Sequence, residues 1–154
     1  MIKLINKYFF NNKYIIWIVD DRIENQVMIA ASFKNIKKHI NIVKLNSCQE
    51  YYSAVDKCNN GTRPHFIFMD YFMGENYGTE LIKYAKNKRY LVGFPIIIGH
   101  SSNLDASHEM VKVGGDFVLE KIKGLEYSAS IVKHFSDIIK VREIINNRSL
   151  NYRK

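Results

Sequence analysis

The chain has 154 residues, 47% of them hydrophobic, and carries a formal net charge of +8. This size and composition suit a single domain with one ordinary core. No apolar run approaches the roughly 18–20 residues that a membrane-spanning helix needs, so we expect no membrane span. The positive charge is dispersed along the chain rather than gathered in an aromatic-rich cluster, which argues against nucleic acid as a partner.

The first predicted strand, Ile15–Val19, is apolar at every position, which is typical of a parallel strand covered by helices on both faces. A helix should follow it, and helical spacing places four apolar residues on its buried face: Ile23, Val27, Ala30 and Ala31. His39–Leu45 alternates between apolar and polar residues, which predicts a second strand near a sheet edge.

Ser47 can cap a helix over about residues 49–58, with Tyr52 and Val55 facing inward. The turn-forming segment Asn59–Pro64 then leads to a third strand, His65–Met69. Gly78 begins the next predicted helix. The buried residues of that helix are Leu81, Ile82 and Ala85.

The fourth predicted strand, Pro95–Ile98, is followed by Gly99–Ser102. A short helix over about residues 106–113 should stop at Gly114 and Gly115. Phe117–Leu119 is the fifth strand, and a last helix covers about residues 126–146. This alternation predicts an α/β fold with a five-stranded parallel sheet, right-handed crossovers and helices on both faces.

Chemically reactive side chains follow four of the five predicted strands: Asp20 and Asp21, Asp70, Ser101, and Lys121. The carboxyl ends of parallel strands meet at one edge, so we expect these side chains to converge there. The carboxylates suit a small hard cation such as Mg²⁺, and Asp70 can attack phosphorus as a nucleophile. Each residue also has a simpler interpretation, because Asp20 and Asp21 could cap a helix, Ser101 could occupy a turn, and Lys121 could be a surface lysine.

The sequence resembles the receiver domain of two-component response regulators over about residues 12–146. Four motifs carry the resemblance: Ile18-Val19-Asp20-Asp21, Phe68-Met69-Asp70-Tyr71-Phe72-Met73 with Gly78, Gly99-His100-Ser101, and Gly114-Gly115-Asp116 with Lys121. The resemblance implies a flavodoxin-like (βα)5 fold. It also implies Mg²⁺-dependent transfer of a phosphoryl group from a phosphohistidine to Asp70.

The resemblance also assigns a role to each site residue. Four of them would hold Mg²⁺: Asp20, Asp21, Asp70 and the backbone carbonyl of Phe72. The Ser101 hydroxyl would face the phosphoryl group, and Lys121 would pair with one of its oxygens. Counting strictly from Pro95 would place His100 at the hydroxyl position instead; we favour Ser101 because Gly-x-Ser/Thr is common in this family.

Three positions depart from the family pattern. Gly74 stands where the family usually has proline, and Ile122 replaces the proline that usually follows the lysine. Val118 replaces the switch aromatic of the fifth strand, which puts the usual coupling between hydroxyl and aromatic residue in question.

The sequence therefore predicts a receiver domain at residues 12–146, a short leader at 1–11 and a basic tail at 147–154. Cys48 and Cys58 have no metal-site spacing, which favours free thiols and a cytoplasmic location. We expect a phosphoacceptor signalling domain rather than an enzyme, able to phosphorylate itself from a phosphodonor and to lose the phosphoryl group again. Its phosphodonor would be a histidine kinase or histidine phosphotransfer protein, its output would act through an unidentified downstream protein, and homodimers are possible.

Two alternative functions share parts of this pattern. The first is a receiver-like adaptor that acts without phosphorylation, suggested by Gly74, Val118 and Ile122. The second is a phosphohydrolase of the haloacid-dehalogenase type, but that family needs Asp-x-Asp after its first strand, and Asp20-Asp21-Arg22 does not supply it.

Overall fold

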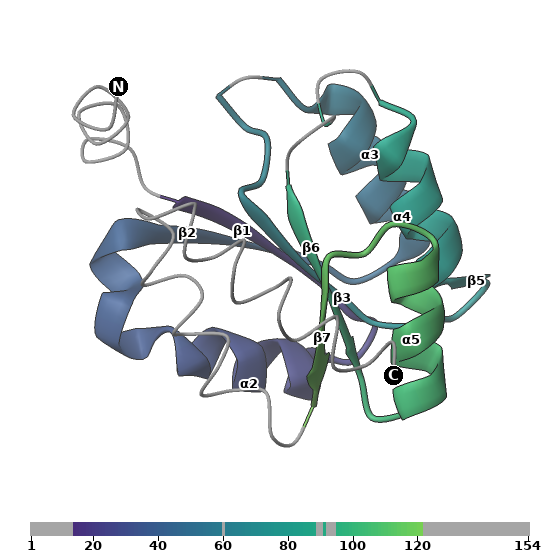
Figure 1. Cartoon of the computed structure of the whole chain (residues 1–154). Helices are drawn as coiled ribbons and strands as arrows, with labels where there is room; N and C mark the ends of the chain where they lie inside the picture. The colour runs from purple at the N-terminus through teal and green to yellow at the C-terminus, as the bar shows by residue number, and fades with distance from the viewer. Residues whose placement is uncertain (1–13, 60, 89–90, 92–94, 122–154) are drawn as a thin grey trace, which may run out of the picture.

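The computed structural model of this protein describes residues 14–59, 61–88, 91 and 95–121. Within this part of the chain the strands of the main sheet are β1 (Tyr14–Val19), β2 (Ile40–Leu45), β3 (Phe66–Met69), β6 (Ile96–Ser101) and β7 (Phe117–Glu120). The helices are α2 (Ile23–Ser32), the 3-10 helix η1 (Lys34–His39), α3 (Cys48–Lys57), α4 (Gly78–Lys86) and α5 (Leu104–Lys112). As Figure 1 shows, α2 covers one face of the sheet, and α3, α4 and α5 cover the other.

The main sheet is parallel throughout and has the order β2-β1-β3-β6-β7, which is the flavodoxin-like strand order. The predicted α/β fold with a five-stranded parallel sheet and helices on both faces is therefore confirmed. Val19 pairs with both Leu45 and Met69, and Met69 pairs with Gly99, so the carboxyl ends of these strands meet at one edge. The strand order reverses between β1 and β3, which makes this the topological switch point of the sheet. Open parallel sheets bind ligands outside the carboxyl ends of the strands at such a point.

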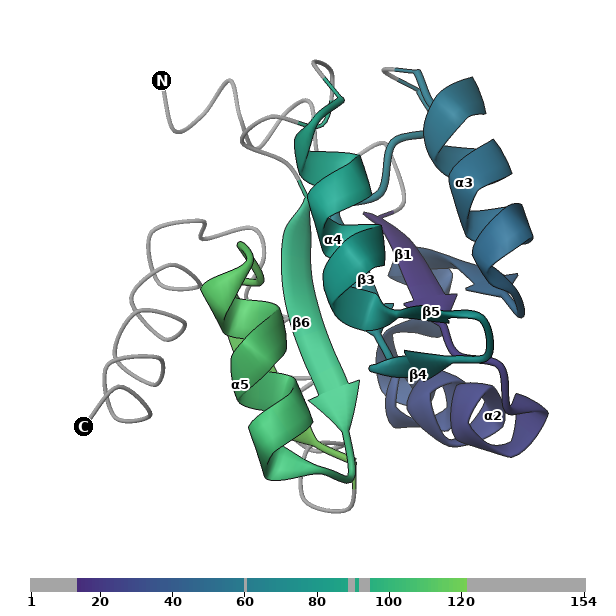
Figure 2. The ribbon, with the colours of Figure 1, turned by 90° about the vertical axis from the view of Figure 1, so that its right-hand side faces the viewer.

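A short antiparallel hairpin, β4 (Phe72–Met73) and β5 (Asn76–Tyr77), follows β3. Figure 2 shows it at the carboxyl end of the sheet, between α2 and α4. Gly74 lies in its turn with a φ of +71°, a backbone conformation that proline cannot adopt. The glycine at this position therefore gives the loop a different course from one that a proline would allow.

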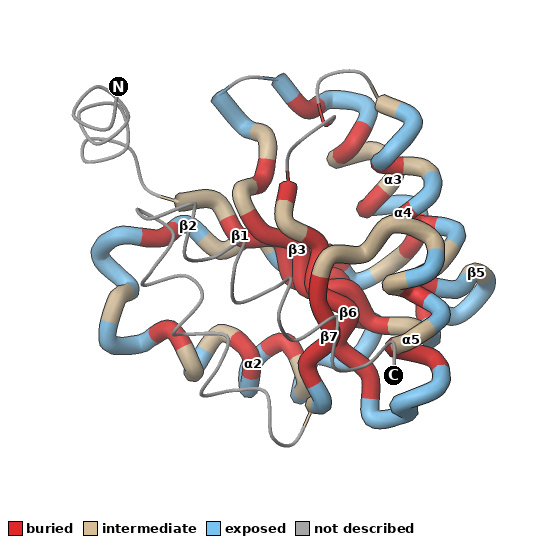
Figure 3. The backbone as a smooth tube through the Cα atoms, in the orientation of Figure 1, coloured by how far each residue is buried: buried red, intermediate tan, exposed pale blue. Residues whose placement is uncertain are grey.

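The hydrophobic core has two parts because successive residues of a strand point to opposite faces of the sheet. Trp17, Val19 and Met69 pack under α3 and α4, whereas Ile18 and Phe68 pack under α2. Figure 3 shows the buried residues concentrated along the central strands. Each side chain of this kind contributes about 1.5–3 kcal/mol when fully buried, so the central strands hold the sheet edge in a fixed geometry.

The predicted buried face of the first helix is wrong. Ile23 is 67% exposed and Val27 is 52% exposed, and Ala31 is exposed as well. The residues that α2 buries are Gln26 and Ile29, with Ala30 partly buried. The predicted residues and the buried residues both fit helical spacing. Because Gln26 is polar, the apolar pattern alone did not identify the face that packs on the sheet.

The predictions for the next two helices agree with the structure more closely. Ser47 caps α3, because its Oγ accepts a hydrogen bond from the Glu50 backbone nitrogen at 3.1 Å, although Tyr51 rather than Tyr52 is the fully buried tyrosine of that helix. Leu81, Ile82 and Ala85 are buried in α4 as predicted. The fourth strand, however, extends through Gly99 and His100 to Ser101 rather than ending at Ile98.

The predicted leader at 1–11, the last helix at 126–146, the tail at 147–154 and the position of Ile122 lie outside the described residues. No helix in the described part of the chain is both long and apolar enough to cross a membrane.

Candidate functional site

Asp20 and Asp70 lie side by side at the carboxyl edge because each directly follows one of two adjacent strands. The Asp20 backbone nitrogen donates to the Leu45 carbonyl at 3.2 Å, and the Asp70 nitrogen donates to the Val19 carbonyl at 2.9 Å, so both residues continue the hydrogen bonding of the sheet. Asp20 is 1% exposed and Asp70 is 6% exposed, whereas Asp21 is exposed. Asp20, Asp21 and Asp70 each offer one carboxylate oxygen, and these oxygens lie within 4.8 Å of one another.

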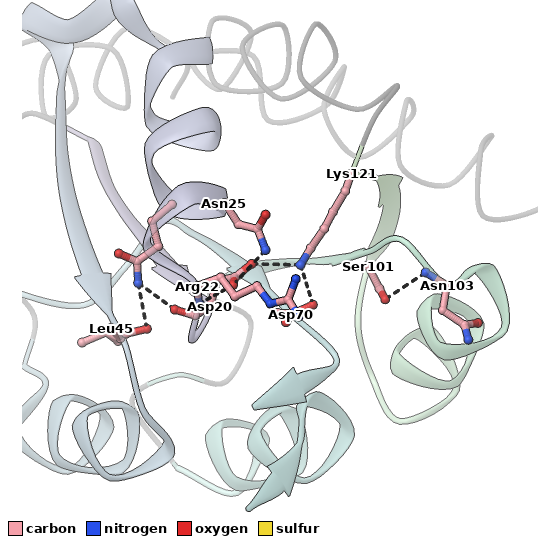
Figure 4. A network of polar contacts seen from close by, with 9 residues as sticks. Asp20, Arg22, Asn25, Leu45, Asp70, Ser101, Asn103 and Lys121 are labelled. Carbon is pink, nitrogen blue, oxygen red and sulfur yellow. Dashed lines mark hydrogen bonds and ion pairs between the residues drawn. The ribbon is translucent and has the colours of Figure 1, made fainter. Parts of the chain in front are cut away.

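Lys121 follows β7 and bridges the two buried carboxylates (Figure 4). Its Nζ lies 3.0 Å from Asp20 Oδ2 and 2.9 Å from Asp70 Oδ1, and its side chain is 13% exposed. Buried carboxylates are tolerated only when they are paired. One ammonium therefore serves two buried acids, and a third acid, Asp21, lies at the opening of the site.

The surroundings of Asp70 disfavour its ionised form. Burial raises the pKa of Asp70 above its ordinary value, the hydrogen bond from Lys121 lowers it, and the nearby charge of Asp20 raises it further. The net direction is upward, so the lysine does not fully compensate for the loss of water and the neighbouring carboxylate. A cation placed among these oxygens would favour the ionised form.

The carboxylate of Asp20 is oriented by the first turn of α2. Its Oδ1 accepts hydrogen bonds from the Arg22 backbone nitrogen at 2.9 Å and from Asn25 Nδ2 at 3.2 Å. Gln26, which is 2% exposed, contacts the backbone of Asp20 instead. Sequence reasoning missed Asn25 and Gln26 because it assigned the wrong face of this helix to the interior.

Ser101 and His100 lie on opposite faces of β6. Ser101 is 2% exposed, lines the cavity at the acidic site, and accepts a hydrogen bond from the Asn103 backbone nitrogen at 3.1 Å. His100 points toward the α2 face, where its ring centroid lies 6.2 Å from that of Phe68. Burial is the main cause that lowers the pKa of His100 to about 4.

A cavity of about 500 Å³ opens at this edge of the sheet. Asp21, Asp70, Ser101 and Lys121 line it, whereas Asp20 and His100 do not. Phe72, at 53% exposure, forms an apolar part of its wall. The lining residues are Asp21, Arg22, Asn25, Met28, Asp70, Phe72, Ser101, Ser102 and Lys121.

Gly78 allows the chain to pass closely behind Asp70. Its backbone nitrogen donates to the Tyr71 carbonyl at 2.7 Å, and a Cβ built at this position would lie 2.3 Å from the Asp70 carbonyl oxygen. Val118, in β7, is 4% exposed and lies in the core without an aromatic ring.

Comparison of the sequence with protein-family models finds no match, and comparison with curated proteins finds none either. Solved structures do match. The chain is similar to a CheY-like response regulator receiver domain protein from Methanospirillum hungatei, with 16% identity and a TM-score of 0.66 over 82% of this chain and 95% of that chain. It is also similar to the chemotaxis response regulator CheY4 of Vibrio cholerae, with 18% identity and a TM-score of 0.66 over 80% and 98% of the two chains.

A third similar structure is a response regulator protein from Burkholderia pseudomallei with a phosphorylated aspartic acid, a calcium ion and citrate. It shares 17% identity and a TM-score of 0.61 over 88% of this chain and 75% of that chain. Together these likenesses show that the chain has the fold of response-regulator receiver domains.

Proposed function

We propose that this chain, which has the receiver fold, is a response-regulator receiver that accepts a phosphoryl group on Asp70. The observation that carries the proposal is the placement of Asp70 at the β1/β3 switch point, with Asp20 and Asp21 beside it and Lys121 paired to it at 2.9 Å. The phosphorylated aspartic acid of the similar Burkholderia pseudomallei protein supports the same chemistry.

The proposed reaction is a transfer between a phosphohistidine and a carboxylate. An Asp70 carboxylate oxygen forms a bond to phosphorus while the phosphorus–nitrogen bond of the donor breaks. The imidazole, protonated on its other ring nitrogen, leaves as a neutral ring with the electron pair of that bond. Lys121 would pair with a phosphoryl oxygen, and the Ser101 hydroxyl would donate to another. The donor would be a histidine kinase or a histidine phosphotransfer protein.

The residues at the site fit a divalent cation. Among the described residues, three carboxylates lie within 4.8 Å of one another, and two basic side chains, Lys121 and Arg22, line the same cavity. Negative charge is therefore in excess, and oxygen donors of this kind suit Mg²⁺. We propose that Asp20, Asp21, Asp70 and the backbone carbonyl of Phe72 hold it. The cation would supply positive charge that balances the carboxylates and the incoming phosphoryl oxygens.

We further propose that the receiver domain spans residues 12–146, with a short leader at 1–11 and a basic tail at 147–154. Its output would be a protein–protein interaction with a downstream partner or a second copy of the chain, in the cytoplasm.

The test is the intact mass of the protein after incubation with MgCl₂ and acetyl phosphate or phosphoramidate, beside an Asp70→Asn control. We expect one added phosphoryl group that hydroxylamine removes, and no addition to the control. An unmodified protein with both donors, or an equally modified Asp70→Asn variant, would contradict the proposal.

A second candidate function is an adaptor that works without phosphorylation. Val118 favours it, because this buried position offers no aromatic ring that could reorient after phosphorylation. In that case Asp70→Asn would leave the biological output of the protein unchanged in a genetic replacement, whereas the phosphoacceptor proposal expects that output to be lost.

A further inference from the structure

Gln26 is a buried polar side chain that none of the roles proposed above uses. It lies in α2 and is 2% exposed. Its Nε2 donates to the backbone carbonyl of Asp20 at 2.7 Å and to Asn46 Oδ1 at 2.7 Å, and it lies 3.5 Å from the Leu45 carbonyl. A buried amide with two short hydrogen bonds of this kind is costly to lose.

The Asp20 carbonyl is a sensitive point of the site. It belongs to the planar peptide unit that joins Asp20 to Asp21, so the direction of the carbonyl also sets the direction in which the chain enters Asp21. β1 ends at Val19 and α2 begins at Ile23, so this peptide unit lies between two regular elements. Gln26 holds it from the helix side.

The two acids of this segment differ in how they are held. The Asp20 carboxylate is fixed directly, by Arg22, Asn25 and Lys121. Asp21 is exposed, so packing does not restrict its side chain. The position of its carboxylate therefore depends strongly on the backbone that carries it.

A second contact orients Asn46, whose side-chain oxygen accepts a hydrogen bond from Gln26. Glu50 Oε2 accepts hydrogen bonds from the Asn46 backbone nitrogen at 2.7 Å and from Asn46 Nδ2 at 3.3 Å. This leaves Asn46 Oδ1 directed at Gln26. Glu50, Asn46 and Gln26 thus form a chain of hydrogen bonds, here called the brace. The brace runs from the first turn of α3 to α2 and ends on the Asp20 carbonyl.

We propose that Gln26 is a positioning residue of the cation site, which holds the Asp20–Asp21 peptide so that the Asp21 carboxylate converges with those of Asp20 and Asp70. This inference rests on the proposed function, because it assumes that the three acids bind a cation. Removing a contact that orients a metal ligand commonly weakens metal affinity about 10–100-fold.

The first test is a calorimetric titration of the Gln26→Met variant with MgCl₂. Methionine has a similar shape and keeps the helix, but it cannot donate either hydrogen bond. We expect the Kd for Mg²⁺ to rise about tenfold or more. The matched control is Ile29→Val, which removes one buried methyl group from the same helix face and should leave the Kd within about twofold of the parent value, since Ile29 lies outside the brace.

An unchanged Kd in folded Gln26→Met, or an equal rise in Ile29→Val, would overturn the proposal. If Gln26→Met does not fold, Asn46→Ala decides the question. Asn46 is exposed, and its loss removes only the outer half of the brace. We then expect a Kd rise of a few fold, and an unchanged Kd refutes the role.

A metal-free measurement separates this inference from the proposed function. Hydrogen exchange of the Asp20 and Arg22 backbone amides reports on the same segment without Mg²⁺, because these amides bond to Leu45 and to Asp20 Oδ1. Gln26→Met should accelerate their exchange more than Ile29→Val does, and equal rates would overturn the positioning role. A parent protein that binds no Mg²⁺ would instead overturn the cation site of the proposed function, and the exchange rates would still decide whether Gln26 holds the segment.

Discussion

Replacing Gly78 by alanine should damage the acidic site through the backbone rather than through a charged side chain. The added Cβ would lie 2.3 Å from the Asp70 carbonyl oxygen and 3.0 Å from Met110 Sδ. Ordinary contact begins near 3.4 Å, so Asp70 and the start of α4 must separate by about 1 Å. The methyl group cannot be accommodated by a side-chain rotation alone, because the nearest atom belongs to the backbone of the proposed phosphoacceptor.

The expected magnitude follows from this displacement. Overpacking of a well-filled interior costs about 1–3 kcal/mol, and the alanine recovers at most about 1 kcal/mol of helix propensity. We therefore expect the free energy of unfolding to fall by about 1–2 kcal/mol. A displacement of about 1 Å at a reacting group can slow a reaction about 100-fold, so phosphorylation should slow by about 10- to 100-fold.

The assay is the rate of phosphoryl incorporation from acetyl phosphate, together with urea unfolding of the same samples. Gly99→Ala is the matched control, because its Cβ would meet the end of the flexible Met110 side chain, with Cε at 3.0 Å, rather than the backbone of Asp70. We expect the control to lose less than about 1 kcal/mol and to keep its phosphorylation rate within a few fold. Parent-like phosphorylation of Gly78→Ala, or an equal loss in Gly99→Ala, would refute the reasoning.

Three further predictions concern charge and polarity in the interior. Asp70→Asn should raise the free energy of unfolding in metal-free buffer by about 0.5–2 kcal/mol. The pKa of Asp70 is raised in the folded protein, so its ionised form opposes folding at any pH above that pKa. Urea unfolding measures this change, and a less stable variant would contradict the prediction. The folded-state pKa of His100 is about 4 and its ordinary value is 6.5, so its contribution to stability should fall by up to about 3 kcal/mol as the pH drops from 6.5 to 4. Burial also lowers the pKa of His65 to about 4, so His65 adds to the loss in the same pH range. His100→Leu should make this part of the stability–pH curve less steep, and an unaltered slope would contradict the role of His100. Ser107 Oγ is buried and has no hydrogen-bond partner in the described part of the chain. Ser107→Ala should therefore stabilise the protein by about 0.5–1 kcal/mol in thermal or urea unfolding, and a loss of stability would contradict this reasoning.

The sequence alone determined the order of the five main strands and of the α-helices between them, and it placed Asp20, Asp70 and Lys121 directly after three of these strands. An uninterrupted apolar run such as Ile15–Val19 fits either a fully buried strand or part of a buried helix. These runs are short and turn-forming residues separate them, which favours strands. Once a parallel sheet is inferred, its geometry brings Asp20, Asp70 and Lys121 to one edge, because all parallel strands point the same way. The convergence of the site was therefore predictable from local patterns and one rule of topology.

Only the tertiary structure decided how these groups interact. Lys121 is paired with both Asp20 and Asp70 across the sheet, and no local pattern encodes a contact between residues so far apart in the sequence. The sequence pattern also led to the wrong buried face of α2, because the pair Ile23 and Val27 fits helical periodicity as well as the pair Gln26 and Ile29 does. In the structure, Gln26 donates to the buried carbonyl of Asp20, which an apolar side chain could not do, and Ile29 packs in the core on the same side of the sheet.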